Sequence, residues 1–103
     1  MSSISRQVIE GAQVQGVDEA IVYSVSVLPV PSSVISVKVY DMTDSFTDVT
    51  STVMPTGSAT ISGGTIVLPR LTALTEEHAF RVEVRYSDGT NTLEPYFLVR
   101  AER

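Results

Sequence analysis

The residues that could perform chemistry are few in this chain, and their spacing favours turns over a catalytic centre. His78 is the only histidine, and it follows Glu76 and Glu77 directly. General-base catalysis needs a nucleophile and an orienting carboxylate arranged around such a histidine. Adjacent residues of one turn define no pocket for them. We therefore interpret His78 as an exposed turn residue and predict that the protein is not an enzyme and has no catalytic residues.

Three carboxylates, those of Asp41, Asp44 and Asp48, fall close together in the sequence. Oxygen ligands at this density could converge on calcium. However, the spacing is not that of an EF-hand loop, which needs a glycine and a terminal glutamate. Aspartate is also common in turns, because its carboxylate accepts hydrogen bonds from nearby backbone N–H groups. We favour the turn interpretation and predict no metal site, with calcium as the alternative.

The composition removes several other classes of function. The chain has no cysteine, so disulfides, thiolate nucleophiles and zinc–thiolate sites are excluded. Twelve acidic residues against seven basic ones give a net charge of −5, which does not attract a phosphate backbone. No apolar run approaches the roughly 20 residues of a membrane helix, and the N-terminus lacks the apolar stretch of a secretory signal. We predict no cofactor, no nucleic-acid partner and no membrane partner.

The elements that would position any site are β-strands. Valine occurs 16 times in the 103 residues, and β-branched side chains favour a pleated sheet. Alternation of apolar with polar residues is clearest at 79–87 and recurs at 20–28 and at 33–40, where Ile35, Val37 and Val39 form the apolar set. The patterns and the turn residues between them predict strands at 20–28, 33–40, 48–53, 58–62, 65–69, 79–87 and 93–101, and a further one near 5–10. About seven short strands predict an all-β, antiparallel β-sandwich.

The chain divides into two parts on this interpretation. Residues 18–103 form the sandwich domain. Residues 1–17 are polar and weakly patterned, and they form either an edge strand or an N-terminal arm that orders on a neighbouring subunit.

The register of 79–87 against 93–101 follows from the cost of burying a charge. Phe80, Val82, Val84 and Tyr86 form the inward set of the first strand. The second strand could turn inward either Pro95, Phe97 and Val99 or Tyr96, Leu98 and Arg100. The second choice would bury the Arg100 guanidinium at a cost of several kcal/mol, so we predict the first. This register places Ser87 opposite Thr92 and Arg85 opposite Glu94, a favourable cross-strand pair.

The same register predicts an interaction surface. Tyr96 and Leu98 then point outward beside the charged residues of 79–87, and strand 33–40 adds to this face if it lies on the other side. Tyrosine and arginine are enriched at the centres of protein interfaces. The alternative is an ordinary solvated sheet face. The predicted interface residues are Lys38, Tyr40, Arg81, Arg85, Tyr96 and Leu98.

Two resemblances to known families rest on the order of short motifs. Leu74, Phe80, Val82 and Val84 resemble the corner between the fifth and sixth strands of fibronectin type III-like domains. That family usually has tyrosine where this chain has Phe80. Over 19–101 the chain is similar to the small Ig-like structural proteins of tailed bacteriophages. The motifs that carry this similarity are Ile35–Val39, Asp48–Thr50, Gly57–Ile66, Leu71–Leu74, Phe80–Val84, Ser87–Gly89 and Glu94–Val99.

The bacteriophage resemblance implies an Ig-like sandwich that is a head decoration, connector or fibre–tail adaptor protein. The expected partners are other virion proteins, namely capsid, connector or tail components, and copies of the chain itself. The expected location is the virion, assembled in the host cytoplasm. Binding would use the predicted sheet face and the N-terminal arm. The alternative is a surface or secreted fibronectin type III-like module for adhesion or carbohydrate binding; the absence of tryptophan and of a signal speaks against it.

Overall fold

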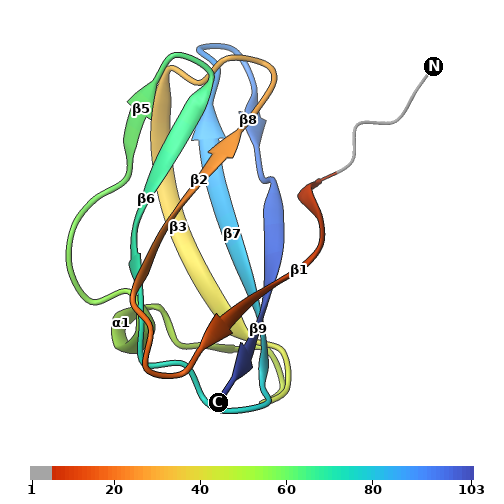
Figure 1. Cartoon of the computed structure of the whole chain (residues 1–103). Coiled ribbons are helices and arrows are strands. Elements are labelled where there is room, and N and C mark those ends of the chain that lie inside the picture. The colour runs from red at the N-terminus through yellow and green to blue at the C-terminus, as the bar shows by residue number, and fades with distance from the viewer. Residues whose placement is uncertain (1–5) are drawn as a thin grey trace.

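Two β-sheets face each other across an apolar core (Figure 1). The computed structural model describes residues 6–103. The larger sheet has the strand order β1-β9-β7-β3-β4, with β8 also paired to β7, and the smaller sheet has the order β2-β6-β5. The elements are β1 (Gln7–Gly16), β2 (Ile21–Ser26), β3 (Ser33–Asp41), β4 (Thr47–Asp48), α1 (Thr50–Val53), β5 (Thr60–Ser62), β6 (Thr65–Leu71), β7 (Ala79–Ser87), β8 (Thr92–Leu93) and β9 (Tyr96–Glu102). The predicted all-β sandwich is confirmed.

The core is built by the alternation that the sequence displays. In β7 every second residue from Phe80 to Tyr86 is buried, while the residues between them reach the opposite side of the sheet. Phe97 and Val99 of β9 are fully buried beside them, and Ile66, Leu68 and Leu71 of β6 cover them from the smaller sheet. Burial of these side chains, each of which contributes about 1.5–3 kcal/mol, is the main force that holds the two sheets together.

The predicted register between the sixth and seventh strands is also confirmed. Ser87 lies opposite Thr92, and the same antiparallel register continues into β9, where Val82 lies opposite Phe97. Pro95 is buried and Arg100 is exposed, as the charge-burial argument required. The strand predicted at 93–101 is interrupted, however, because Pro95 has no N–H group to offer a neighbouring strand. It is divided into β8 and β9.

The strand predicted at 48–53 is wrong. Only Thr47 and Asp48 pair with β3, and the chain then turns into the single helical turn of α1. The Asp48 carboxylate accepts hydrogen bonds from the backbone N–H of Thr50 at 3.0 Å and from its hydroxyl at 2.6 Å. The Thr50 hydroxyl oxygen in turn accepts the N–H of Val39. Side-chain bonds to the backbone therefore replace a strand ladder, despite the β-branched residues of this segment.

One apolar residue of β3 also departs from its predicted side. The pairing of β3 with β7 shifts between Val34 and Ser36, which is the signature of a β-bulge. Val34 packs against the core, and Ile35 is left 52% exposed. Beyond the bulge the alternation resumes, with Val37 against the core and Val39 fully buried.

Strand β1 lies at one edge of the larger sheet and runs parallel to β9. It is longer than the strand predicted near 5–10, whose first residue falls outside the described part. Gln15 of this strand is fully buried and joins the two sheets. Its side-chain amide donates to the carbonyl oxygens of Leu71 and Glu19, and its oxygen accepts the Tyr23 hydroxyl. A buried amide is stable in a core only when it is satisfied in this way.

Candidate interaction surface

The outward side of the larger sheet brings the six predicted interface residues onto one face, which we call the outer face. Its two central rows are cross-strand neighbours from β3, β7 and β9. One row is Tyr40, Arg81 and Leu98, and the next is Lys38, Glu83 and Tyr96. Arg85 is the next outward-facing residue along β7, two positions beyond Glu83, and it is exposed. The juxtaposition follows from the register, because residues opposite one another in a sheet share a side. That the face forms an interface stays a prediction.

Arg81 is the centre of this face. The central carbon of its guanidinium lies 3.9 Å from the centroid of the Tyr96 ring, and one terminal nitrogen lies 3.1 Å from a carboxylate oxygen of Glu83. Stacking on an aromatic ring and pairing with a carboxylate both restrict the guanidinium plane. The Nε atom of Arg81 is buried and has no hydrogen-bond partner among the described residues. The arginine is therefore held in one orientation before any partner arrives.

A second arginine, Arg6, joins this cluster and was not predicted. It lies 3.6 Å from the Glu83 carboxylate and 5.7 Å from the centroid of the Tyr96 ring, and its Nε donates to the carbonyl oxygen of Glu94. The sequence offered no local signal for it, because Arg6 is separated from these partners by more than 70 residues. Only the parallel pairing of β1 with β9 brings them together.

The turn between β3 and β4 adds an exposed aromatic residue to the rim of the outer face. Phe46 is 53% exposed, and it lines a hollow of about 300 Å³ together with Tyr40, Arg6, Arg81 and Glu83. Ser45 and Phe46 both have positive φ, at 54° and 56°. This conformation costs a bulky non-glycine residue free energy of order 1 kcal/mol, and such strain is concentrated at functional sites.

Lys38 and Arg85 have different surroundings. The Lys38 ammonium lies 3.8 Å from the Asp48 carboxylate. The pKa of Asp48 is lowered, first by the hydrogen bond from the Thr50 hydroxyl, then by the Thr50 backbone N–H, with a smaller effect of Lys38. The register sets Arg85 level with Glu94, as predicted, but the two side chains form no ion pair in the described structure. Arg85 is consequently available to a partner.

Among residues 6–103, no group of three or more His, Cys, Asp or Glu side chains converges in a way that could hold a metal ion. Asp41 is buried, and its carboxylate accepts the backbone N–H groups of Thr43 and Asp44. Its other oxygen lies 2.7 Å from Nδ1 of His78. The interpretation of His78 as an exposed turn residue is therefore wrong: the ring is half-buried and anchors the start of β7 to the β3–β4 turn.

The basic residues are distributed unevenly over the molecule. Five of the seven lie on or beside the outer face, namely Arg6, Lys38, Arg81, Arg85 and Arg100. The other two are Arg70 and Arg103, while the chain as a whole carries −5. The remaining surface is accordingly acidic. Acidic side chains offset part of this positive charge, because Glu83 pairs with Arg6 and Arg81 and Asp48 lies beside Lys38. Arg85 and Arg100 form no ion pair with a described residue, so their charges can attract an acidic partner in a salt-dependent way.

The fold and this face define an all-β sandwich with an arginine–tyrosine surface on one sheet. No family model matches the chain, and no curated protein or solved structure matches it either. Within the described part of the chain, no helix is long and apolar enough to cross a membrane.

Proposed function

We propose that this protein is a non-enzymatic virion protein, structural or accessory, that binds other virion proteins and copies of itself through the outer face. The observation that carries the binding role is the ordered Arg81–Tyr96–Glu83 cluster with Tyr40 and Leu98 beside it. The few residues that contribute most of the binding energy at an interface are enriched in arginine and tyrosine. A side chain that is already held in place loses little conformational entropy when a partner binds.

The uneven charge supports association between copies. The outer face carries most of the basic residues, and the rest of the molecule is acidic. Contact between the outer face of one copy and an acidic surface of the next is a heterologous contact, which builds rings or filaments when repeated. The assignment to a virion is supported by the resemblance to Ig-like bacteriophage proteins over 19–101.

The first test removes the apolar and aromatic part of the outer face. We expect Tyr96→Ser combined with Leu98→Ser to weaken self-association by about ten-fold or more, which is about 1.4 kcal/mol. The melting temperature should change little, because both residues lie outside the core. Sedimentation equilibrium measures the association, and raising the salt concentration should weaken the wild-type association.

The matched control is Val22→Ser combined with Ile61→Ser, which removes two exposed apolar residues from the smaller sheet. It should associate as the wild type does. Equal weakening in the control would contradict the assignment to the outer face.

The virion assignment has its own test. Mass spectrometry of particles purified from a producing culture should find the protein in constant ratio to the major structural proteins. A protein that is monomeric at all concentrations and absent from the particles would overturn the proposal. Binding to glycans together with that absence would favour the adhesion or carbohydrate-binding alternative.

A further inference from the structure

The hollow on the outer face holds more positive than negative charge. It has a volume of about 300 Å³ and is lined by Arg6, Arg81, Glu83, Tyr40 and Phe46. Both guanidinium groups lie beside the same carboxylate oxygen of Glu83, at 3.6 Å for Arg6 and at 3.1 Å for Arg81. One carboxylate offsets the charge of one of the two arginines. The side chains that line the hollow therefore retain a single positive charge.

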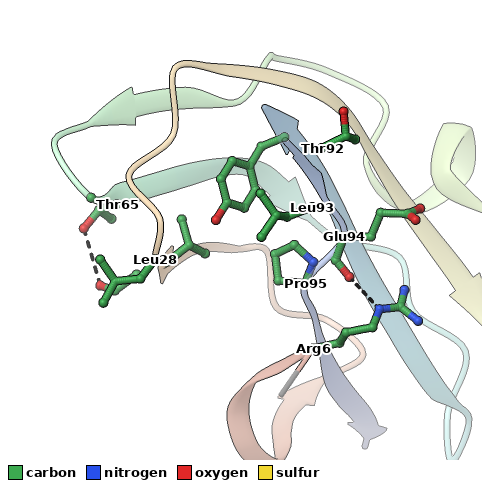
Figure 2. Close-up of a pocket in the computed structure, with 11 residues that line it drawn as sticks. Arg6, Leu28, Thr65, Thr92, Leu93, Glu94 and Pro95 are labelled. Carbon is green, nitrogen blue, oxygen red and sulfur yellow. Dashed lines mark hydrogen bonds between the residues drawn. The ribbon is translucent and has the colours of Figure 1, made fainter. Parts of the chain in front are cut away.

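Both arginines are held in place, and the charge of Arg81 is partly shielded from water. The Arg81 side chain is 21% exposed, and its guanidinium stacks on the Tyr96 ring. The Nε of Arg6 donates to the carbonyl oxygen of Glu94 at 3.1 Å (Figure 2). Arg6 also lines the apolar cleft drawn in Figure 2, which is a different cavity. Charges that are partly buried are screened less by salt than exposed ones, so they attract an opposite charge more strongly.

The two guanidinium groups have donors for a further acceptor. Each carries five N–H groups in a planar fork that matches the two oxygens of a carboxylate. With the described residues, one terminal nitrogen of each arginine contacts Glu83, and the Nε of Arg6 contacts the Glu94 carbonyl oxygen. These contacts account for only part of the donors. A second carboxylate can therefore bind beside the one that the chain already supplies.

The aromatic rings of the hollow favour an acidic side chain over other anions. Tyr40 and Phe46 line the hollow beside the arginines, and Phe46 is 53% exposed. Aromatic rings pack against methylene groups, and their edges carry positive partial charge. One remaining positive charge matches one carboxylate. A nucleic acid or another polyanion would instead be repelled by the net charge of −5 on the whole chain.

We propose that this hollow binds the carboxylate of one aspartate or glutamate side chain of the partner protein, through the terminal N–H groups of Arg6 and Arg81. The methylene group next to that carboxylate packs against Phe46. Glu83 limits the affinity, because its carboxylate competes with the incoming one for the same donors. The inference rests on the proposed function for the partner being a protein, but the site itself can be tested without that partner.

The first experiment titrates the protein with the capped peptide acetyl-Gly-Glu-Gly-amide, whose side-chain carboxylate is its only charge. The matched probe is acetyl-Gly-Gln-Gly-amide, which has nearly the same shape and no charge. We expect the glutamate peptide, in the millimolar range, to shift the nuclear magnetic resonance signals of Arg81, Glu83 and Phe46. The glutamine peptide should leave these signals unchanged. No shift, or equal shifts with both peptides, would overturn the proposal.

Two variants of the hollow should change the affinity for the glutamate peptide in opposite directions. Arg6→Gln removes one cation, and we expect binding to weaken by about three-fold. Glu83→Gln removes the competing carboxylate, and binding should strengthen by about three-fold. The control Arg70→Gln removes the same charge as Arg6→Gln from an exposed position of the smaller sheet and should bind as the wild type does. Equal weakening by the control, or weakening by Glu83→Gln, would overturn the proposal, and unchanged melting temperatures establish that the variants fold.

Self-association distinguishes failure of this site from failure of the proposed function. We expect Arg6→Gln to weaken self-association by about three-fold in sedimentation equilibrium, and Arg70→Gln to leave it unchanged. Wild-type association of Arg6→Gln would contradict the use of the hollow by the partner. If the peptide does not bind but Tyr96→Ser with Leu98→Ser still weakens association, the carboxylate site is wrong and the proposed function stands. If the peptide binds but the protein neither self-associates nor occurs in particles, the carboxylate site stands and the proposed function is wrong.

Discussion

The pair of strands β7 and β9 and the segment from Asp41 to Val53 are held in place by different forces. In the first region, apolar side chains alternate along both strands and are buried against the smaller sheet. In the second region, β4 has only two residues and α1 is a single turn. There the chain path is fixed by the carboxylates of Asp41 and Asp48 and by the hydroxyl of Thr50, which bind backbone groups.

The difference explains why the centre of the outer face is rigid and why its rim is irregular. The regular strands β7 and β9 place Arg81, Glu83 and Tyr96 at fixed spacing, because each core residue forces its neighbour outward. The irregular segment supplies the exposed Phe46 and the Asp48 partner of Lys38. A rigid sheet thus positions the centre of the candidate surface, and a turn held by polar contacts shapes its rim.

The largest expected effect is a loss of stability, and it distinguishes the buried side of β9 from its outer side. We expect Phe97→Ala to destabilise the protein by about 3–5 kcal/mol, because the ring is fully buried and its loss leaves a cavity. Leu98→Ala, the next residue along β9, should cost less than about 1 kcal/mol, because Leu98 lies on the outer face. Chemical denaturation measures both, and similar values for the two variants would contradict the assignment of the two sides.

This contrast also shows what the sequence could predict. Strand β7 and its register with β8 and β9 were predicted correctly, since alternation identifies the two sides of a strand and a buried Arg100 is costly. The same logic placed Lys38 and Tyr40 beside Arg81. It failed for Ile35, because a bulge changes the alternation and leaves no mark in the residue types, and for 48–53, where side-chain hydrogen bonds outweigh β propensity. Arg6 was missed because its contacts depend on pairing between distant strands.

The intermediate effect concerns the buried carboxylate of the irregular segment. We expect Asp41→Ala to destabilise the protein by about 1–3 kcal/mol, because it leaves the N–H groups of Thr43 and Asp44 without their acceptor and removes the partner of His78. Asp44→Ala is the control, since the Asp44 carboxylate makes no hydrogen bond with a described residue. Denaturant unfolding compares them. Equal stability of the two variants would show that Asp41 does not hold the turn.

The smallest effect depends on pH. The pKa of Asp48 is lowered in the folded state, mainly by the Thr50 hydroxyl and backbone N–H. A lowered pKa stabilises the folded protein above the pKa of the unfolded chain, near pH 4, and this contribution is lost as the pH falls through the folded-state pKa. Because the carboxylate is exposed and its contacts are screened by water, we expect Asp48→Asn to cost less than about 1 kcal/mol at pH 7.

The pH dependence isolates the charge of Asp48 from the shape of its side chain. Asparagine keeps an oxygen that can accept from Thr50, so the difference between wild type and Asp48→Asn should shrink toward zero as unfolding is measured at successively lower pH, down through the folded-state pKa of Asp48. We therefore expect Asp48→Asn to change the free energy of unfolding by a small amount that depends on pH. Phe97→Ala should change it by a large amount that does not, because one region is held by polar contacts and the other by apolar packing. A difference that persisted unchanged in acid would mean that packing, not polar contact, holds the segment before α1.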